Sequence, residues 1–383
     1  MDYREYFPTT KKYIYLNHAG VSPLNTYTLK YTNAFIEDAL INGGNSHPKW
    51  MHNVKEAKSL SARIINAHPD EMAILKNTTS GMLTVANGLK FNKGDNIIIP
   101  EKEFPANVHP WLNLQKKGVN VKFVKWRDGR ILIEDILNLI DERTRLVSVS
   151  YVQFLNGYRI NLEELGHHLK KRNVLFFADV VQGMGVFDID VKRDNIDFLS
   201  AGAHKWLLGA EGVGFFYCKN DNLDMLDVHN LGYASVVAED YLDYSMTLKP
   251  NSSRFEEGCA NMLGIHTTLG SLKLIEGVTV AKIRERILDI TDYFAESLKN
   301  EGFDIKSPRE HEGEKSGIVS FYSKKIDSKE LFKKLTENNC YVALRDNAIR
   351  ISPHFYNSKE EVARFMEILS SPLVGGIAMH GQG

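Results

Sequence analysis

Short apolar runs alternate with helical patterns between residues 70 and 217, and this alternation constrains the fold more than any other feature of the sequence. The runs have the length and the β-branched or aromatic content of buried strands. Strands that alternate with helices form a mainly parallel sheet covered on both faces. The sequence therefore predicts an α/β fold, with strands at 73–75, 96–100, 146–152 and 174–179 and helices at 54–67, at 162–172 and opening at Asn77.

After about residue 265 the pattern changes to long amphipathic helices, expected at 280–300 and 328–338, around short strands at 317–322 and 349–352. A final helix should begin at Ser358, where Glu361 completes a capping box. We therefore expect three parts: an N-terminal segment, 1–25, that joins the small domain and lines the mouth of the active site; a large domain, 26–262; and a smaller α+β domain, 263–383.

The composition narrows the class of protein. A chain of 383 residues suits one large and one smaller domain, and a net charge of −1 suggests neither nucleic acid nor a membrane surface as partner. The three cysteines lie far apart without CxxC spacing, which argues against a zinc or disulfide framework and fits a reducing compartment. No signal peptide and no run of about 18 apolar residues is visible, so a cytoplasmic location is expected.

The segment 198–217, FLSAGAHKWLLGAEGVGFFY, places Lys205 in a glycine-rich loop between two apolar runs. Desolvation disfavours an ammonium ion, so a lysine between buried strands has a lowered pKa and can form a Schiff base. On this segment alone, a plain hairpin with a surface lysine is the alternative.

An upstream strand ends in Asp179 and is followed by Gln182. Carboxylates at strand ends of α/β proteins face the ligand crevice. A lysine for the aldehyde and a carboxylate that keeps a ring nitrogen protonated are what pyridoxal phosphate requires.

The segments DVVQGMG and AHKWLLGAEGVGFFY together resemble the class V aminotransferases, fold-type I pyridoxal-phosphate enzymes that include cysteine desulfurases, kynureninases and isopenicillin N epimerase-like proteins. The resemblance extends from YLNHAG near the N-terminus to RISPHFYN near the C-terminus. It implies pyridoxal 5'-phosphate as cofactor, a large domain with a mainly parallel sheet, and a smaller α+β C-terminal domain. It also implies a homodimer in which residues near 259–261 reach the cofactor of the partner subunit.

The resemblance also assigns site residues. Lys205 would hold the cofactor as an internal aldimine and then move protons, while Asp179 would keep the ring nitrogen charged. The first turn of a helix would bind the phosphate, Phe104 would stack on the ring, and Gln182 would contact the phenolic oxygen. The full cofactor-binding set is Thr78, Thr79, Ser80, Gly81, Phe104, Gln153, Asn156, Asp179, Gln182, His204, Lys205 and Cys259.

For the substrate, the resemblance assigns Arg350 to the carboxylate, because a guanidinium binds a carboxylate through two hydrogen bonds. Asn17 and His18 would lie at the mouth of the site, although His18 could instead only cap a turn. Arg345 is a second candidate cation. In the turn-rich segment 42–50, His47 is a further candidate, with a solvated loop histidine as the alternative.

Several positions depart from the desulfurase pattern. Desulfurases carry histidine where this chain has Phe104 and usually threonine where it has Cys259. They also need a mobile cysteine shortly before the arginine, whereas the segment 342–350 has none and Cys340 lies in a pattern typical of a buried strand. We therefore expect an aminotransferase acting on a small amino acid. The alternatives are an epimerase like the isopenicillin N epimerases, a lyase of the cysteine desulfurase or selenocysteine lyase kind, and a catalytically quiet binding protein of this fold.

Overall fold

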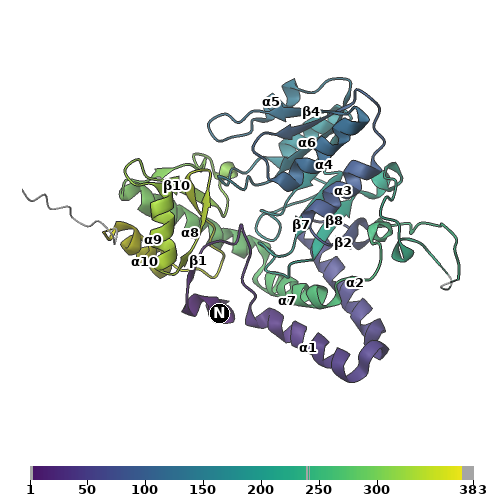
Figure 1. Cartoon of the computed structure of the whole chain (residues 1–383), viewed down its shortest axis with the longest axis horizontal. Helices are drawn as coiled ribbons and strands as arrows, with labels where there is room; N and C mark the ends of the chain where they lie inside the picture. Colours follow the sequence, from purple (N-terminus) through teal and green to yellow (C-terminus); the bar gives the residue numbers. More distant parts are fainter. Residues whose placement is uncertain (1–2, 239, 241, 373–383) are drawn as a thin grey trace, which may run out of the picture.

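The large domain is built on a seven-stranded sheet in the order β2-β8-β7-β6-β5-β3-β4. The computed structural model describes residues 3–238, 240 and 242–372. β8 runs antiparallel to both of its neighbours, whereas β3–β7 pair in parallel. The predicted mainly parallel sheet is confirmed (Figure 1), with strands β2 Met72–Leu75, β3 Asn96–Pro100, β4 Asn120–Val124, β5 Thr144–Ser150, β6 Leu175–Asp179, β7 Phe198–Gly202 and β8 Gly214–Cys218.

Each face of this sheet packs against its own hydrophobic core. Successive side chains of a strand enter these two cores in turn, because they point to opposite sides of the sheet. Ile97 and Ile99 of β3 belong to the hydrophobic core under α3, whereas Ile98 between them belongs to the core under α2, α6 and α7. This explains why the strands read as continuous apolar runs. The helices of the large domain are α1 Thr26–Asn42, α2 His47–Ile64, α3 Thr78–Gly88, α4 His109–Leu112, α5 Ile133–Asn138, α6 Leu162–Lys171 and α7 Met262–Val278.

The small domain is a four-stranded antiparallel sheet, in the order β12-β13-β10-β9, packed against three helices. The N-terminal β1 pairs in parallel with β11 and adds Ile14 and Leu16 to the core of this domain. The capping box of the last helix at Ser358 is present as predicted. The elements are β1 Ile14–Tyr15, α8 Val280–Asn300, β9 Asp304–Ile305, β10 Val319–Tyr322, α9 Ser328–Glu337, β11 Cys340–Tyr341, β12 Ala343–Arg345, β13 Ala348–Ile351 and α10 Lys359–Ser370.

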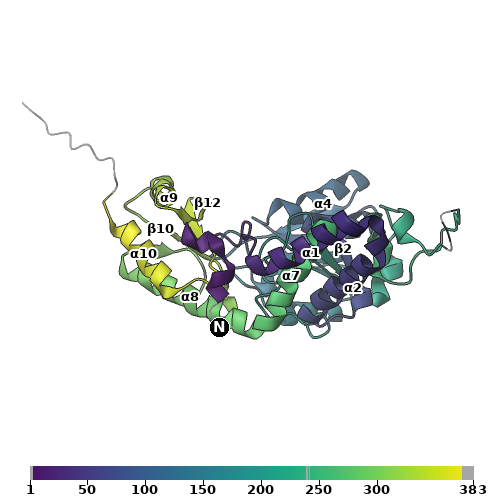
Figure 2. The same cartoon turned by 90° about the horizontal axis from the view of Figure 1, so that it is seen from below.

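The expected domain boundary stays a prediction, and one expected loop is wrong. α1 and α7 pack side by side with α2 along the large domain (Figure 2), so the expected boundary at residue 262 falls where α7 begins. α7 belongs to the large domain by its packing, and the division of the chain stays a prediction. The expected loop at 42–50 is wrong, because only Gly43–Ser46 forms a short turn and His47 already starts α2.

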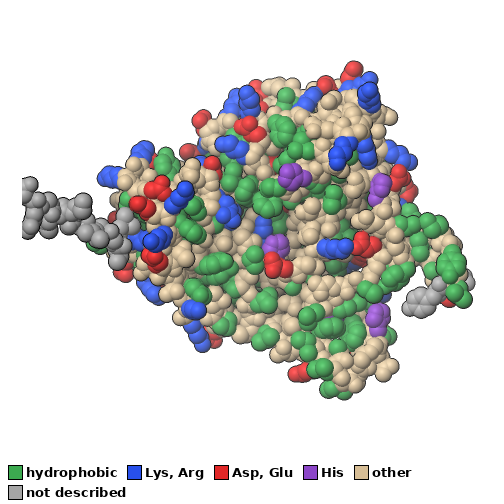
Figure 3. All heavy atoms as spheres, in the orientation of Figure 1, with side chains coloured by type: hydrophobic (Ala, Val, Ile, Leu, Met, Phe, Trp, Pro, Cys, Tyr) green, Lys and Arg blue, Asp and Glu red, His purple; other side chains and the backbone are tan. Residues whose placement is uncertain are grey.

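Large hydrophobic side chains remain exposed on α1 and on the segment 231–246. Leu40 and Ile41 are 80% and 81% exposed, and Leu242 and Tyr244 are 78% and 81% exposed. Figure 3 shows hydrophobic side chains gathered over both regions. Among the described helices, none combines the length and apolar character needed to cross a membrane.

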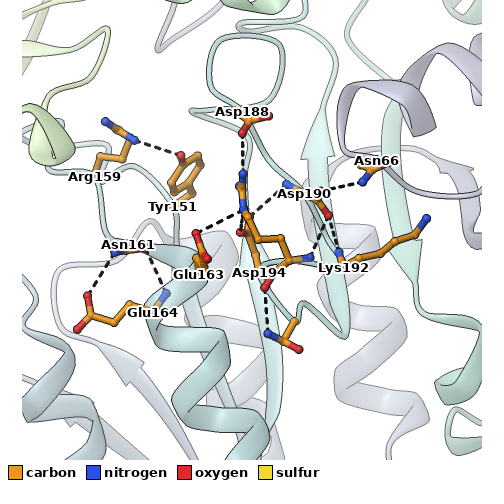
Figure 4. A network of polar contacts seen from close by, with 12 residues as sticks. Asn66, Tyr151, Arg159, Asn161, Glu163, Glu164, Asp188, Asp190, Lys192 and Asp194 are labelled. Carbon is orange, nitrogen blue, oxygen red and sulfur yellow. Dashed lines mark hydrogen bonds and ion pairs between the residues drawn. The ribbon is translucent and has the colours of Figure 1, made fainter.

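A polar network fixes the turn that leads into β7. Arg193 pairs with Asp188 and Asp194, each at 2.7 Å, and Asn66 of the α2–β2 connection donates to Asp190 at 2.7 Å. Figure 4 shows these carboxylates gathered beside the start of α6. The turn approaches that helix so closely that a Cβ on Gly166 would lie 1.8 Å from the carbonyl oxygen of Asp194.

We therefore expect Gly166→Ala to destabilise the protein by about 1–3 kcal/mol, since the backbone must shift to admit a methyl group. Gly277→Ala is the matched control: this glycine is also helical, but a Cβ added there would meet nothing within 4 Å. The control should gain up to about 1 kcal/mol from helix propensity. Urea unfolding followed by circular dichroism measures both, and equal effects of the two substitutions would contradict the steric explanation.

Candidate active site

The site lies at the carboxyl ends of the central strands. Asp179 is the last residue of β6, and the strand register places it between Ser150 of β5 and Ser200 of β7. The chain leaves β7 at Gly202 and reaches Lys205 in the connection to β8. Lysine and carboxyl therefore meet at one edge of the sheet, as the sequence predicted.

Lys205 is held in a mostly apolar surrounding. Its Nζ lies 5.3 Å from the centre of the Phe104 ring, and Phe104 meets Phe154 edge to face. Burial lowers the pKa of the Lys205 ammonium to about 8, and the charge of Asp179 opposes this shift. About a tenth of Lys205 is thus the free, nucleophilic amine at pH 7, far more than of an ordinary lysine.

Asp179 is also buried, and one of its oxygens accepts a hydrogen bond from the backbone N–H of Val181 at 3.0 Å. Burial raises the pKa of Asp179 to about 7, and the negative charge of Glu103 adds to this shift while Lys205 opposes it. In its ionised form, the Asp179 carboxylate can pair with a protonated ring nitrogen.

The first turn of α3 faces the same edge of the sheet. Its N-cap is Asn77, whose side chain accepts from the N–H of Ser80. A Cβ on Gly202 would lie 3.0 Å from the His204 ring and 3.4 Å from Thr78 Oγ1, so these two side chains converge on the end of β7. The end of an eleven-residue helix with hydroxyl side chains is suited to bind a phosphate.

Arg350 of β13 is buried and reaches across from the small domain. Its Nη1 donates to the carbonyl oxygen of Phe154 at 2.8 Å and its Nη2 to Asn17 Oδ1 at 3.2 Å. Nε is buried and has no hydrogen-bond partner among the described residues. Burial lowers the pKa of Arg350 to about 9, and the charge of Arg345 contributes. A guanidinium with an unused donor fits a substrate carboxylate.

A short N-terminal segment, residues 17–22, joins these groups, and we call it the strap. Ser22 donates from its backbone N–H to the carbonyl oxygen of His204 at 2.8 Å and from its hydroxyl to that of Lys205 at 2.5 Å. Asn17, at the other end, orients Arg350. A Cβ on Gly20 would lie 2.7 Å from the Asn17 side chain, so a larger residue there would displace the amide that orients Arg350.

His18 is also part of the strap, but its ring is fully buried. Nδ1 lies 2.8 Å from the carbonyl oxygen of Ser352 and Nε2 lies 2.8 Å from the hydroxyl of Tyr356. Since a carbonyl can only accept, Nδ1 carries the proton and Nε2 accepts from Tyr356. Burial lowers the pKa of His18 to about 4. With both nitrogens used, the geometry does not support the predicted substrate contact and favours a structural role.

Three other predicted cofactor residues have partners inside the protein. Gln182 donates to the carbonyl oxygen of Ala19 and accepts from Trp206 Nε1. Asn156 donates to the carbonyl oxygen of Gly129 and accepts from Tyr158 N–H, which holds a turn. Gln153 donates to Glu103, while its Oε1 is buried without a partner among the described residues.

Cys259 and His47 lie elsewhere. Both line a cavity of about 610 Å³, together with Ser80 from the first turn of α3 and Trp50 from α2. The Sγ of Cys259 is 3.1 Å from the hydroxyl of Tyr233. The structure thus brings Cys259 and His47 near the predicted phosphate site, and it does not place them beside Lys205.

Two residues of the site were missed by the sequence analysis. Ser22 lies in the segment YIYLNHAGVSPL, where it reads as an ordinary turn residue. Glu103 precedes Phe104, and only the structure shows that it is buried beside Asp179.

The converging groups fit pyridoxal 5'-phosphate. Lys205 would bind its aldehyde, Asp179 its ring nitrogen, Phe104 its ring face and the first turn of α3 its phosphate. When bound, this cofactor withdraws electrons from the α-carbon of an amino acid. Fold and site together define a fold-type I pyridoxal-phosphate enzyme.

The model of the family named Aminotransferase class-V matches residues 14–365, and the chain belongs to this family. It is 27% identical to a probable cysteine desulfurase of Methanothermobacter thermautotrophicus, over 96% of both chains. An apo cysteine desulfurase from Thermococcus onnurineus NA1 has the same fold, with a TM-score of 0.87, 23% identity and 96% of both chains covered.

A further solved relative in fold is C-DES, a cystine C-S lyase. In a structure of a C-DES variant, glycine is covalently linked to the pyridoxal-phosphate cofactor. That structure superposes with a TM-score of 0.89 and 21% identity, covering 96% of this chain and 98% of C-DES. These comparisons favour the sulfur-handling alternative over the aminotransferase that the sequence predicted.

The state of Lys205 can be tested in the cofactor-free protein. We expect its amine to titrate with a midpoint near pH 8, with the free amine above the midpoint and the ammonium below it. Asp179→Asn should move the midpoint lower, because the carboxylate charge favours the ammonium. Reductive ¹³C-methylation and NMR would follow the titration, with Lys205→Arg assigning the signal. An unchanged or higher midpoint in Asp179→Asn would show that the two groups do not interact.

The strap makes a separate prediction. Ser22→Ala removes the hydroxyl bond to the Lys205 carbonyl, at a cost of about 1 kcal/mol, and should weaken the binding of added pyridoxal 5'-phosphate about fivefold. Absorbance titration measures this. Thr10→Ala is the control, since its hydroxyl makes a similar 2.7 Å bond to the carbonyl oxygen of Phe7 outside the strap. If both variants bind like the parent protein, the strap does not hold the lysine loop.

Proposed function

We propose that this chain is a pyridoxal-phosphate-dependent lyase that breaks the Cβ–S bond of a cysteine-type L-amino acid. We further propose that the sulfur leaves directly and is not transferred to a thiol of the protein. The first part is supported by the relatives that are named for cysteine desulfuration and cystine C–S cleavage. The second part rests on the placement of the cysteines.

That placement is the observation that carries the proposal. Cys340 is 1% exposed within β11, which pairs with β1, and burial raises the pKa of its thiol to about 12. Cys218 is buried at the end of β8, and burial raises its pKa as well. Cys259 lines the cavity of about 610 Å³ that also contains His47, and its thiol contacts the hydroxyl of Tyr233. A thiol must be ionised and mobile to accept sulfur from a substrate, and neither buried cysteine is.

The residues of the site divide the reaction between them. Arg350, oriented by Asn17, binds the carboxylate of the substrate. It thereby sets which face of the substrate α-carbon is presented to Lys205. The free amine of Lys205 takes the proton from Cα. The Cβ–S bond then breaks with its electrons going to sulfur, which leaves and is protonated. Water hydrolyses the remaining enamine, so that cysteine and water yield pyruvate, ammonia and hydrogen sulfide.

Transamination of a small amino acid is the second candidate. It is favoured by Phe104, which has no proton to give to a leaving group yet provides the apolar wall beside Lys205. Transamination needs only proton shuttling by Lys205 and has no leaving group to protonate. This is the activity expected from the sequence.

A homodimer belongs to the same proposal. The exposed side chains of α1 and of the segment 231–246 form apolar patches of the kind that mark interfaces. The cavity lined by Cys259, Ala260 and Asn261 also contains Ser80, so a partner subunit seated there would lie near the phosphate site. The cytoplasmic location stays a prediction.

The products distinguish these activities. With L-cysteine or L-cystine, we expect pyruvate and released sulfur in equal amounts, measured by a lactate dehydrogenase assay and by sulfide or persulfide detection. A variant with Cys218, Cys259 and Cys340 all replaced by serine should keep the parent rate within about twofold, or a milder Cys259→Ser/Cys340→Ala variant should if the first does not fold.

Three other results would contradict the lyase. Alanine as the product, together with loss of turnover in the cysteine-free variant, would mean desulfuration through a protein persulfide. Loss of cofactor absorbance with an amino acid, restored by a keto acid, would mean transamination. Conversion of an L-amino acid to its D-form would mean epimerisation.

A further inference from the structure

We propose that Glu103 is a positioning residue of the cofactor site: its hydrogen bonds fix the loop after β5, and through Ser150 they hold its carboxyl beside Asp179, the group that would pair with the cofactor ring. This role concerns the cofactor site common to the family. It does not depend on which bond of which amino acid is broken.

Glu103 follows β3 and is 6% exposed. Oε1 accepts from the backbone N–H of Ser150 at 2.9 Å and from Gln153 Nε2 at 3.0 Å, and Oε2 bonds the Ser150 hydroxyl at 2.5 Å. No lysine or arginine in the described part of the chain forms an ion pair with it. A buried carboxyl is costly unless it is hydrogen-bonded, so the bonds to Ser150 and Gln153 are what allow Glu103 to lie here.

These bonds connect the end of β3 with the loop that carries the substrate and cofactor contacts. Gln153 is followed by Phe154, whose carbonyl oxygen receives the Arg350 guanidinium and whose ring packs on Phe104. Phe104, the neighbour of Glu103, faces Lys205. Fixing Gln153 and Ser150 therefore holds both the aromatic wall beside Lys205 and the acceptor that orients Arg350.

The charge of Glu103 acts on Asp179. Ser150, which Glu103 bonds, is the strand partner of Asp179, and the Glu103 charge helps to raise the pKa of Asp179. The charged groups that act on Asp179 are Glu103 and Lys205, and those that act on Lys205 are Asp179, Arg350 and Arg345. Burial also raises the pKa of Glu103 itself, while its hydrogen bonds with Ser150 and Gln153 oppose that shift. At pH values where Glu103 is ionised, removing its negative charge should therefore lower the pKa of Asp179 and keep Asp179 ionised at lower pH.

The test is the binding of pyridoxamine 5'-phosphate to the cofactor-free protein between pH 5 and 9, followed by quenching of tryptophan fluorescence. This probe has the ring and phosphate of the cofactor but no aldehyde, so its affinity does not require a covalent bond to Lys205. The variants are Glu103→Gln, which keeps an acceptor for Ser150 and Gln153 but loses the charge, and Glu103→Ala, which loses both. Glu101→Gln is the control, because that carboxylate accepts from the backbone N–H of Trp126, away from the loop after β5.

For Glu103→Gln we expect near-parental affinity at pH 8 and an acid limit of binding that moves down by about one pH unit. For Glu103→Ala we expect an affinity loss of about tenfold or more at every pH, and Glu101→Gln should match the parent. The proposal is overturned if Glu103→Gln leaves the acid limit in place, or if it loses as much affinity at pH 8 as Glu103→Ala. Glu103→Gln keeps an oxygen that accepts from Ser150 N–H and Gln153, and its NH2 group can donate to the Ser150 hydroxyl, so the shift of its acid limit can be read even if Glu103→Ala does not fold.

Discussion

The candidate active site depends on the strap, because Lys205 follows a strand of the large sheet whereas Arg350 lies in the sheet of the small domain. Lys205 lies in the connection after β7, near Asp179 at the end of β6. Arg350 lies in β13, in the four-stranded sheet of the small domain. One turn of chain at residues 17–22 bonds the backbone of the lysine loop at one end and the guanidinium at the other. The distance between the amine and the carboxylate clamp, which decides how an amino acid is presented, is thus set by local backbone geometry near the N-terminus.

Burial gives these groups their reactivity. Desolvation lowers the pKa of the Lys205 ammonium and raises the pKa of the Asp179 carboxyl. The two pKa values therefore lie close to each other, near neutral pH. Arg350 is buried as well, and in the described part of the chain its hydrogen bonds go to a carbonyl and an amide oxygen, not to a carboxylate. A neutral partner leaves its positive charge available to a substrate, whereas a buried aspartate would neutralise it.

The sequence predicted the fold and the meeting of Lys205 with Asp179 because both depend on local signals, while the roles of these residues stay predictions. Buried strands read as apolar runs, helix starts carry their own caps, and a lysine and an aspartate at strand ends must meet at one edge of a parallel sheet. β3 and α8 have the predicted bounds. The missing parts depend on contacts between distant segments. The burial of Glu103, the bonds of Ser22 to the lysine loop and the enclosure of His18 by Ser352 and Tyr356 have no signature within their own segments.

The pairing of β1 with β11 also determines when the site can exist during synthesis. Residues 14–15 leave the ribosome long before their partners at 340–341, which follow the whole of the large domain in the sequence. The large sheet, all of whose strands end by residue 218, can form earlier. Ser22 of the strap can bond the lysine loop earlier, but Asn17 meets Arg350 only after the small domain has appeared. A chain interrupted before residue 340 would therefore carry a folded sheet with Lys205 and Asp179 in place, but without the arginine that Asn17 orients.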